Sequence, residues 1–370
     1  MHLFASHPVK TLREFVLNPT LRIGDGEPGA PWSAPSGAPL PDGGASAELR
    51  AAVGQVADQV PGLHGVVVVH RGELVAEWYG RGKDFRQGRP LGTVTFGPRT
   101  LHDVRSVSKS VVALLYGIAL ADGSVPDPEA PLLEQFPEHA DLATDPQRAR
   151  ITVGHALTMT TGLEWWERPP YTDPRNGEIA MRLAADPYRY VLGRPVVSPP
   201  GERWNYSGGT TEVLGRLISR GTGLPLAEFA RRRLFAPLGL GRVEWTATTD
   251  RTPIACSGLR FAPRDLARIG QTVLDGGTWD GQQVVPADWI ATMLTRHTST
   301  GWGGYGYQWY LQGEGRDRWV GGIGNGDQRL HLLPEHDLVV VQTTGRYDGG
   351  LDTGPLPRLL APVLDHVTSA

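Results

Sequence analysis

The stretch SVSKSVVALLYGIALADG, residues 106–123, opens with two serines and a lysine and continues as an apolar run. Apolar side chains recur in it with helical spacing, at Val107, Val111, Leu114, Leu115 and Ile118. This spacing predicts a largely buried helix from residue 106 to about residue 121. The helix is expected to end near Asp122-Gly123, because glycine is common just beyond a helix C-terminus.

Ser106 and Lys109 lie one helical turn apart, so both side chains are expected on one face of this helix. A serine hydroxyl is a poor nucleophile until a base takes its proton, and a lysine can do so when burial lowers its pKa. Free N–H groups at the helix start also suit a developing oxyanion. Lysine occurs only at Lys10, Lys83 and Lys109 among 36 basic residues, which favours a catalytic pair over a surface lysine after a capping serine.

Apolar runs near both ends of the chain predict β-hairpins. GVVVVHRGELVAEWYG, residues 65–80, has two runs around Arg71-Gly72, and RLHLLPEHDLVVVQTTG, residues 329–345, has two runs around residues 334–337. WVGG, residues 319–322, adds a further strand entry. Together these hairpins indicate one antiparallel sheet built from both termini. His331 and His336 straddle this second hairpin and are expected to face solvent.

Helical patterns dominate the middle of the chain. They occupy residues 151–162, 209–223, 226–239 and 263–277, and a short helix is expected at about residues 47–60. We therefore predict an α/β (α+β) fold with an antiparallel sheet domain, flanked by helices, from residues 1–124 and 256–370. A mostly helical domain would occupy residues 125–255, with the active site between the two. Residues 22–48, rich in Gly and Pro, are expected to be irregular.

The composition excludes several classes of function. A net charge of -3 gives no reason to expect a nucleic-acid or anionic-membrane partner, and no 18-residue apolar stretch or signal peptide is present. A cytoplasmic location is therefore expected. Cys256, the only cysteine, lies among small residues and is expected to pack in the core rather than act as a nucleophile. The G-x-S-x-G, H-x-H-x-D and H-E-x-x-H motifs do not occur, so neither an α/β-hydrolase elbow nor a zinc hydrolase is indicated.

Two further segments carry candidate chemistry. Trp204-Asn205-Tyr206-Ser207-Gly208-Gly209 places Tyr206 in a loop before a predicted helix, where a tyrosine can shuttle protons or simply pack. Residues 321–328, GGIGNGDQ, lead into a strand, and their glycines allow a ligand to approach the backbone or form a flexible turn.

These three motifs, in this order, resemble those of the penicillin-recognising serine hydrolases, which have S-x-x-K on a helix, then a Tyr motif, then a Gly-rich motif on a strand. The chain is most similar to the class C β-lactamase-like branch, which includes carboxylesterases and 6-aminohexanoate-dimer hydrolases. The likeness covers roughly residues 60–350. It includes residues 102–105 before the serine, residues 158–163 followed by two tryptophans, and residues 263–267.

The resemblance implies an acyl-enzyme on Ser106, with Lys109 and Tyr206 moving protons and with no metal or cofactor. It implies an oxyanion hole formed by the backbone N–H groups of Ser106 and Gln328, and a cleft lined by Tyr171 and by the turn at Asn325 and Gly326. Small-molecule esters or amides are the expected substrates, and the oligomeric state is left open.

Two positions depart from the β-lactamase pattern. Gly208 replaces the usual asparagine of Tyr-x-Asn, and Asn325 stands where lysine or histidine usually begins the third motif. A neutral Asn325 offers no charge-assisted contact to the carboxylate of a penicillin or cephalosporin, which argues against a dedicated β-lactamase. The alternative function is a catalytically silent relative that binds a small acyl or peptide ligand in the same cleft.

Overall fold

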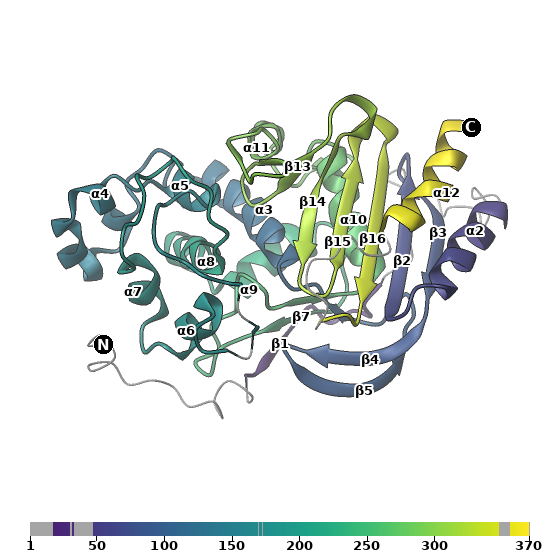
Figure 1. Ribbon diagram of the computed structural model, residues 1–370, viewed down its shortest axis with the longest axis horizontal. Helices are drawn as coiled ribbons and strands as arrows, with labels where there is room; N and C mark the ends of the chain where they lie inside the picture. Colours follow the sequence, from purple (N-terminus) through teal and green to yellow (C-terminus); the bar gives the residue numbers. More distant parts are fainter. Residues whose placement is uncertain are drawn as a thin grey trace.

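The computed structural model describes residues 18–29, 32, 47–168, 170–171, 173–347 and 356–369. A large antiparallel sheet occupies one half of the molecule, and a group of mostly short helices lies beside it (Figure 1). Helix α3 (Val107–Ala121) runs between these two parts, as the sequence pattern predicts. The predicted fold class is therefore confirmed.

The eight strands of the large sheet are ordered β11-β12-β13-β14-β15-β16-β2-β3, so segments from both chain ends meet at the β16–β2 pair. Both predicted hairpins are present, as is the further strand entered by WVGG. The strands are β2 (Leu63–His70), β3 (Glu73–Tyr79), β11 (Thr298–Ser299), β12 (Gly304–Tyr305), β13 (Tyr310–Gln312), β14 (Trp319–Gly324), β15 (Gln328–Leu333) and β16 (Leu338–Thr344).

Helices cover both faces of this sheet, which explains its continuous valine runs. Along β2, Val66 and Val68 belong to one apolar cluster, while Val67 and Val69 belong to the other, because successive side chains point to opposite faces. The first cluster lies under α2 (Ala47–Asp58) and α12 (Leu356–Ser369). The second lies under α3 and α10 (Pro263–Leu274).

The remaining helices are short, apart from α8. They are α4 (Pro146–Ala149), α5 (Val153–Leu157), α6 (Gly177–Leu183), α7 (Pro187–Leu192), α8 (Gly208–Thr222), α9 (Leu226–Ala230) and α11 (Ala287–Met293), with a π-helical turn at Arg231–Phe235 and 3-10 turns at Leu133–Gln135, Pro137–Thr144, Gly315–Asp317 and Pro334–His336. Within the described residues, no helix combines the length and the apolar character needed to span a bilayer.

Three smaller sheets complete the architecture. One has the order β1-β7-β8-β6, formed by β1 (Thr20–Ile23), β7 (Val243–Thr246), β8 (Leu259–Phe261) and β6 (His102–Asp103). The other two are the pairs β4 (Arg81–Arg86) with β5 (Arg89–Thr95) and β9 (Thr278–Trp279) with β10 (Gln282–Gln283). Because β7 pairs with β8, the first of these sheets crosses the domain boundary expected at residue 255.

Some local expectations differ from the structure. The helix expected at residues 151–162 is limited to α5, since Met159 adopts a left-handed φ of 58° that ends it. His331 is buried, not solvent-facing, and its ring packs on Trp319 at 4.4 Å between centroids. In the segment 22–48, residues 24–29 have no regular structure, whereas residues 30–31 and 33–46 lie outside the described residues.

Candidate active site

The turn before Ser106 is held in an unusual conformation. Arg105 has a positive φ of 50°, and Ser106 follows as the N-cap of α3. The neighbouring Ser108 fastens this turn, because its hydroxyl donates to the Arg105 carbonyl at 2.6 Å and accepts from the Leu259 N–H at 3.2 Å. Ser108 is fully buried, whereas Ser106 is 7% exposed. The two serines of the motif therefore have different roles: Ser108 is structural, and Ser106 remains available for chemistry.

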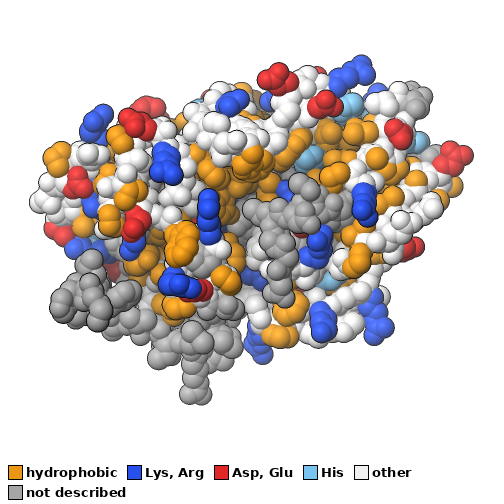
Figure 2. Space-filling view, in the orientation of Figure 1, with side chains coloured by type: hydrophobic (Ala, Val, Ile, Leu, Met, Phe, Trp, Pro, Cys, Tyr) orange, Lys and Arg blue, Asp and Glu red, His pale blue; other side chains and the backbone are white. Residues whose placement is uncertain are grey.

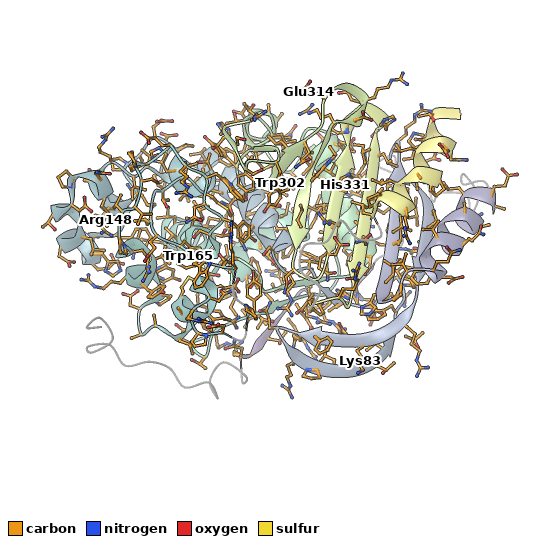
Figure 3. The ribbon with its side chains drawn as sticks, in the orientation of Figure 1. Lys83, Arg148, Trp165, Trp302, Glu314 and His331 are labelled. Carbon is orange, nitrogen blue, oxygen red and sulfur yellow. The ribbon has the colours of Figure 1, made fainter. Side chains whose placement is uncertain are left out.

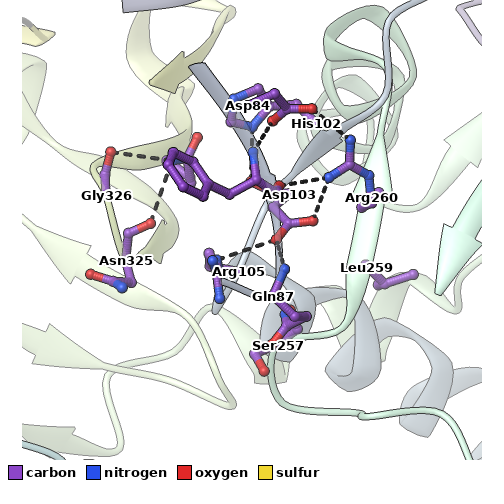
Figure 4. A network of polar contacts seen from close by, with 12 residues as sticks. Asp84, Gln87, His102, Asp103, Arg105, Ser257, Leu259, Arg260, Asn325 and Gly326 are labelled. Atoms are coloured by element: carbon purple, nitrogen blue, oxygen red, sulfur yellow. Dashed lines mark hydrogen bonds and ion pairs between the residues drawn. The ribbon is translucent and has the colours of Figure 1, made fainter. Parts of the chain in front are cut away.

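A buried ion network supports the same turn (Figure 4). Arg260 donates to Asp103 at 2.8 Å and to Asp84 at 3.0 Å, and the other oxygen of Asp103 lies 3.4 Å from Nε of Arg105. The Gln87 N–H also donates to Asp103, at 2.7 Å. These contacts link β4, β6 and β8 to the residue directly before the nucleophile, so they fix where Ser106 is presented.

Lys109 is buried directly beneath Ser106. Its Nζ lies 3.0 Å from Ser106 Oγ and donates to the Cys256 carbonyl at 2.8 Å. The predicted i, i+3 pair is thus brought together on one face of α3. Burial, the largest single influence, lowers the pKa of Lys109, but the charges of Tyr206, Cys256 and Glu167 in their ionised forms outweigh it, and the net pKa is raised.

Tyr206 completes this group. Its hydroxyl lies close enough to Ser106 and Lys109 for both side chains to lower its pKa, and Lys109 Nζ lies 5.0 Å from its ring centroid. Burial raises the pKa of Tyr206 to about 12, although the Lys109 charge opposes the rise. At neutral pH Tyr206 is therefore a phenol, whose hydroxyl can accept one hydrogen bond while donating another.

Tyr206 is part of a mostly apolar cluster of side chains beside Ser106 and Lys109. We call it the aromatic cluster, and it comprises Met159, Trp204, Tyr206, Tyr305, Tyr310 and Ile323. Trp204 packs on Tyr206 at 6.1 Å and on Tyr305 at 5.6 Å between ring centroids. Figure 2 shows hydrophobic side chains gathered on this face between the helical part and the sheet. Sequence reasoning missed Trp204, Tyr310 and Ile323 as site residues, although the first and last lie inside motifs it had singled out.

The Gly-rich segment lies against the start of α3. A Cβ built on Gly322 would lie 3.4 Å from the Cα of Val107, and one built on Gly324 would lie 3.1 Å from the Cβ of Arg105. Ile323, between them, therefore runs alongside Ser106. Pairing between β13 and β14 extends only to Gly321, so in the described sheet the backbone of residues 322–324 has no ladder partner on its β13 side.

The residues of the following turn differ in their exposure. Asn325 is half-buried, and Gly326 has a φ of 81° and packs against Tyr347. Gln328 is fully buried within β15, and its side-chain amide donates to the carbonyls of Asn325, Gly326 and Thr344. Gln328 pairs with Gly324 of β14, and its enclosed side chain supports the turn. The expectation that its backbone N–H lines the oxyanion hole stays a prediction.

The other residues considered in the sequence analysis differ in their burial and position. Tyr171 is half-buried, and burial together with the Glu167 and Tyr206 charges raises its pKa. Cys256 is fully buried, as expected, and burial raises the pKa of its thiol. Figure 3 shows Trp165 in the helical part, with Trp302 and His331 at the sheet. Trp165 is buried, whereas Trp302 is 52% exposed.

Glu167 is a site residue that sequence reasoning missed. Its carboxylate accepts hydrogen bonds from the Trp165 indole and the Gly208 backbone N–H. Burial raises its pKa to about 7, while the nearby Lys109 charge lowers it. The sequence carries no periodic or motif signal for this position, since only the tertiary structure brings the loop after Trp165 to the start of α8.

Comparison with known proteins identifies the family of this chain. Residues 49–361 match the family model described as Beta-lactamase. The chain is 30% identical over 320 residues to the 6-aminohexanoate-dimer hydrolase of Paenarthrobacter ureafaciens, covering 78% of this chain and 76% of that protein. It is 29% identical to Esterase EstB of Burkholderia gladioli, over 52% of this chain and 46% of the esterase.

Among solved structures, a putative 6-aminohexanoate-dimer hydrolase from Bacillus anthracis superposes with a TM-score of 0.70 at 18% identity, covering 95% of this chain and 91% of that one. The penicillin-binding protein from Bacillus halodurans superposes with a TM-score of 0.63 at 14% identity, covering 84% and 98%. At these identities the two structures support the fold alone. The match to the family model spans most of the chain, so this protein belongs to the beta-lactamase family.

Proposed function

We propose that this protein is a serine hydrolase that cleaves small ester or amide substrates with neutral acyl groups through an acyl-enzyme on Ser106. The observation that carries the proposal is the 3.0 Å contact between Lys109 Nζ and Ser106 Oγ at the start of a buried helix. The proposal places the cleft between the sheet part and the helical residues 125–255, and it places the enzyme in the cytoplasm, which cell fractionation would test.

Each residue of the group has a distinct role in the proposed reaction. Lys109, anchored by the Cys256 carbonyl, takes the proton of Ser106 in the molecules in which it is the neutral amine, as Ser106 Oγ attacks the substrate carbonyl. Tyr206, a phenol at neutral pH, passes its proton to the leaving group and takes the serine proton from the Lys109 ammonium in return. The oxyanion would be bound by the Ser106 N–H and by a second backbone N–H, either that of Gln328 or one from the unpaired stretch 322–324. Water then hydrolyses the acyl-enzyme, and the site is regenerated.

Two features support neutral acyl groups as substrates. The aromatic cluster gives the site an apolar wall, and Asn325 brings no charge to the turn. Arg329 follows that turn, but its Nε is paired with Asp327 at 2.6 Å, so its charge is already balanced. The named relatives include both an esterase and an amide-type hydrolase, which supports testing both bond types. Tyr171 would contribute to the same cleft.

The test is a substrate panel of p-nitrophenyl esters, short amides, oligomers of ω-amino acids and nitrocefin, measured for the wild type and Ser106→Ala. Turnover of an ester or amide by the wild type, lost in the variant, supports the proposal. Absence of turnover across the panel, together with no labelling by a fluorophosphonate, would instead favour the second candidate, a catalytically silent protein that binds a small ligand. The departures from the family pattern at Gly208 and Asn325 are the reason to keep this candidate.

A further inference from the structure

Tyr347 lies between two segments that meet at Ser106. Its ring packs against the Arg105 guanidinium, whose Cζ lies 4.6 Å from the ring centroid. A Cβ built on Gly326 would lie 2.8 Å from Cδ1 of the same ring, so the turn between β14 and β15 rests directly against it. Tyr347, shortly after the end of β16, therefore contacts both the residue before the nucleophile and the Gly-rich segment.

Two further rings hold Tyr347 in place. Phe85 on β4 packs edge-on against it with 5.6 Å between ring centroids, and His102 on β6 lies nearly parallel to it at 6.4 Å. The hydroxyl oxygen of Tyr347 is buried and makes no hydrogen bond with any described residue. The described contacts that fix this side chain are therefore those of its ring.

The Arg105 side chain depends on this ring because its polar contacts are incomplete. Its Nε lies 3.4 Å from Asp103 but makes no hydrogen bond among the described residues. Asp103 is already engaged by Arg260 at 2.8 Å and by the Gln87 N–H at 2.7 Å. Arg105 also has a φ of 50°, which is costly for a residue other than glycine and persists only where the surroundings enforce it. Loss of the Tyr347 ring should therefore let this turn relax.

The two segments that contact Tyr347 carry the two halves of the proposed oxyanion hole. One half is the Ser106 N–H, and the other is a backbone N–H close to the Gly326 turn, from residues 322–324 or from Gln328. Such donors stabilise an oxyanion when both lie about 3 Å from it. A displacement of about 1 Å in a catalytic site can cost about a hundredfold in rate. The spacing of the two segments must therefore be fixed.

We propose that Tyr347 is a positioning residue that sets the spacing between the two halves of the oxyanion hole. Its ring is the spacer, with Arg105 and Gly326 as its two contacts, and it acts through them rather than on the substrate. The proposal rests on the function proposed above and adds a residue that shapes its transition state. Because the oxyanion forms only in the transition state, loss of the ring should lower kcat far more than it raises KM.

Three single variants separate the ring from the hydroxyl. Tyr347→Leu removes the ring and should lower kcat for a p-nitrophenyl ester by about tenfold to a hundredfold, with KM changed by less than about threefold. Tyr347→Phe keeps the ring, and its kcat should stay within about threefold of the wild type. The matched control is Tyr188→Leu on α7, which removes a ring that lies 5.4 Å from the Arg216 Cζ in the helical part and should keep the wild-type kcat.

The experiment counts active sites by end-point labelling of Ser106 with a fluorophosphonate and reports kcat per labelled site. A merely structural role of Tyr347 would lower the labelled fraction or the Tm but leave kcat per labelled site unchanged. A loss of about fivefold or more in Tyr347→Leu, with smaller losses in Tyr347→Phe and Tyr188→Leu, supports the inference, and any other pattern overturns it. Failure of the wild type to label on Ser106 would instead overturn the proposed function, so the two failures are distinct.

Arg105→Met tests the other contact of the ring, and it also serves if Tyr347→Leu does not fold. The substitution keeps a long side chain but removes the cation over the ring, while Asp103 keeps its contact with Arg260. We expect a loss of about fivefold or more in kcat per labelled site. Adding Tyr347→Leu should then cost less than about a further threefold, because a spacer needs both of its contacts. A smaller loss in Arg105→Met, or effects that multiply in the double variant, would overturn the inference.

Discussion

Arg260→Met is expected to destabilise the fold strongly by opening the ion network before Ser106. The Arg260 guanidinium donates to Asp103 at 2.8 Å, to Asp84 at 3.0 Å, and to the carbonyls of Phe85 and Leu101 at 2.8 Å each. Its removal leaves two buried carboxylates, of which Asp84 keeps only the hydrogen bond from the adjacent Phe85 N–H among the described residues. Breaking a buried pair in this way costs about 3–5 kcal/mol.

The magnitude translates into a measurable change in melting temperature. With roughly 2.1 cal/mol/K of unfolding entropy per residue, a chain of 370 residues unfolds with about 0.8 kcal/mol/K, so a loss of ~4 kcal/mol lowers the apparent Tm by about 5 °C. The control is Arg233→Met, which removes an exposed pair with Asp122 and should cost about 1 °C or less. Thermal scans of both variants decide the matter. A shift under about 1 °C for Arg260→Met, or equal shifts for the two variants, would refute the reasoning.

Three further outcomes are expected. Lys109→Arg should lower kcat/KM for an ester nearly as far as Lys109→Ala, on the order of 10³-fold, since a guanidinium stays protonated; retention of a tenth of the activity would exclude Lys109 as the base. Asn325→Lys should raise kcat/KM for nitrocefin relative to a p-nitrophenyl ester by about tenfold, and an unchanged ratio would contradict the role given to Asn325. Burial lowers the pKa of His331 to about 3 from 6.5, so the unfolded chain binds an extra proton between these values and stability falls as pH drops through that window. His331→Gln should therefore show a smaller decrease in apparent Tm than the wild type between pH 6.5 and 4.5, and parallel decreases would count against this.

The parts of the fold that were predictable are those encoded by local patterns. The valines of β2 and β16 and the spacing of the α3 side chains are periodic in sequence, so the hairpins and the buried helix could be read directly. The i, i+3 relation of Ser106 and Lys109 is likewise local, and the structure brings the two together. Resemblance to a known family supplied Tyr206, which no local pattern singles out from a packing tyrosine.

The parts that were missed depend on contacts between distant segments. Glu167 reaches the site because Gly208, 41 positions later, leaves room for it, and no window of sequence contains both. The enclosure of the Gln328 side chain could not be read from the sequence for a related reason, because it depends on carbonyls of the turn and of β16. His331 appeared to flank a turn, but β15 places its side chain under Trp319.

The most direct test of the proposed mechanism is the position of the covalent adduct. The protein is incubated with a slow ester substrate or a fluorophosphonate, and intact-mass and peptide mass spectrometry locate the modification. The account predicts one adduct per chain, on Ser106, absent from Ser106→Ala and slowed in Lys109→Ala. An adduct on Ser108, Ser207 or Cys256, or turnover by Ser106→Ala at the wild-type rate, would contradict it.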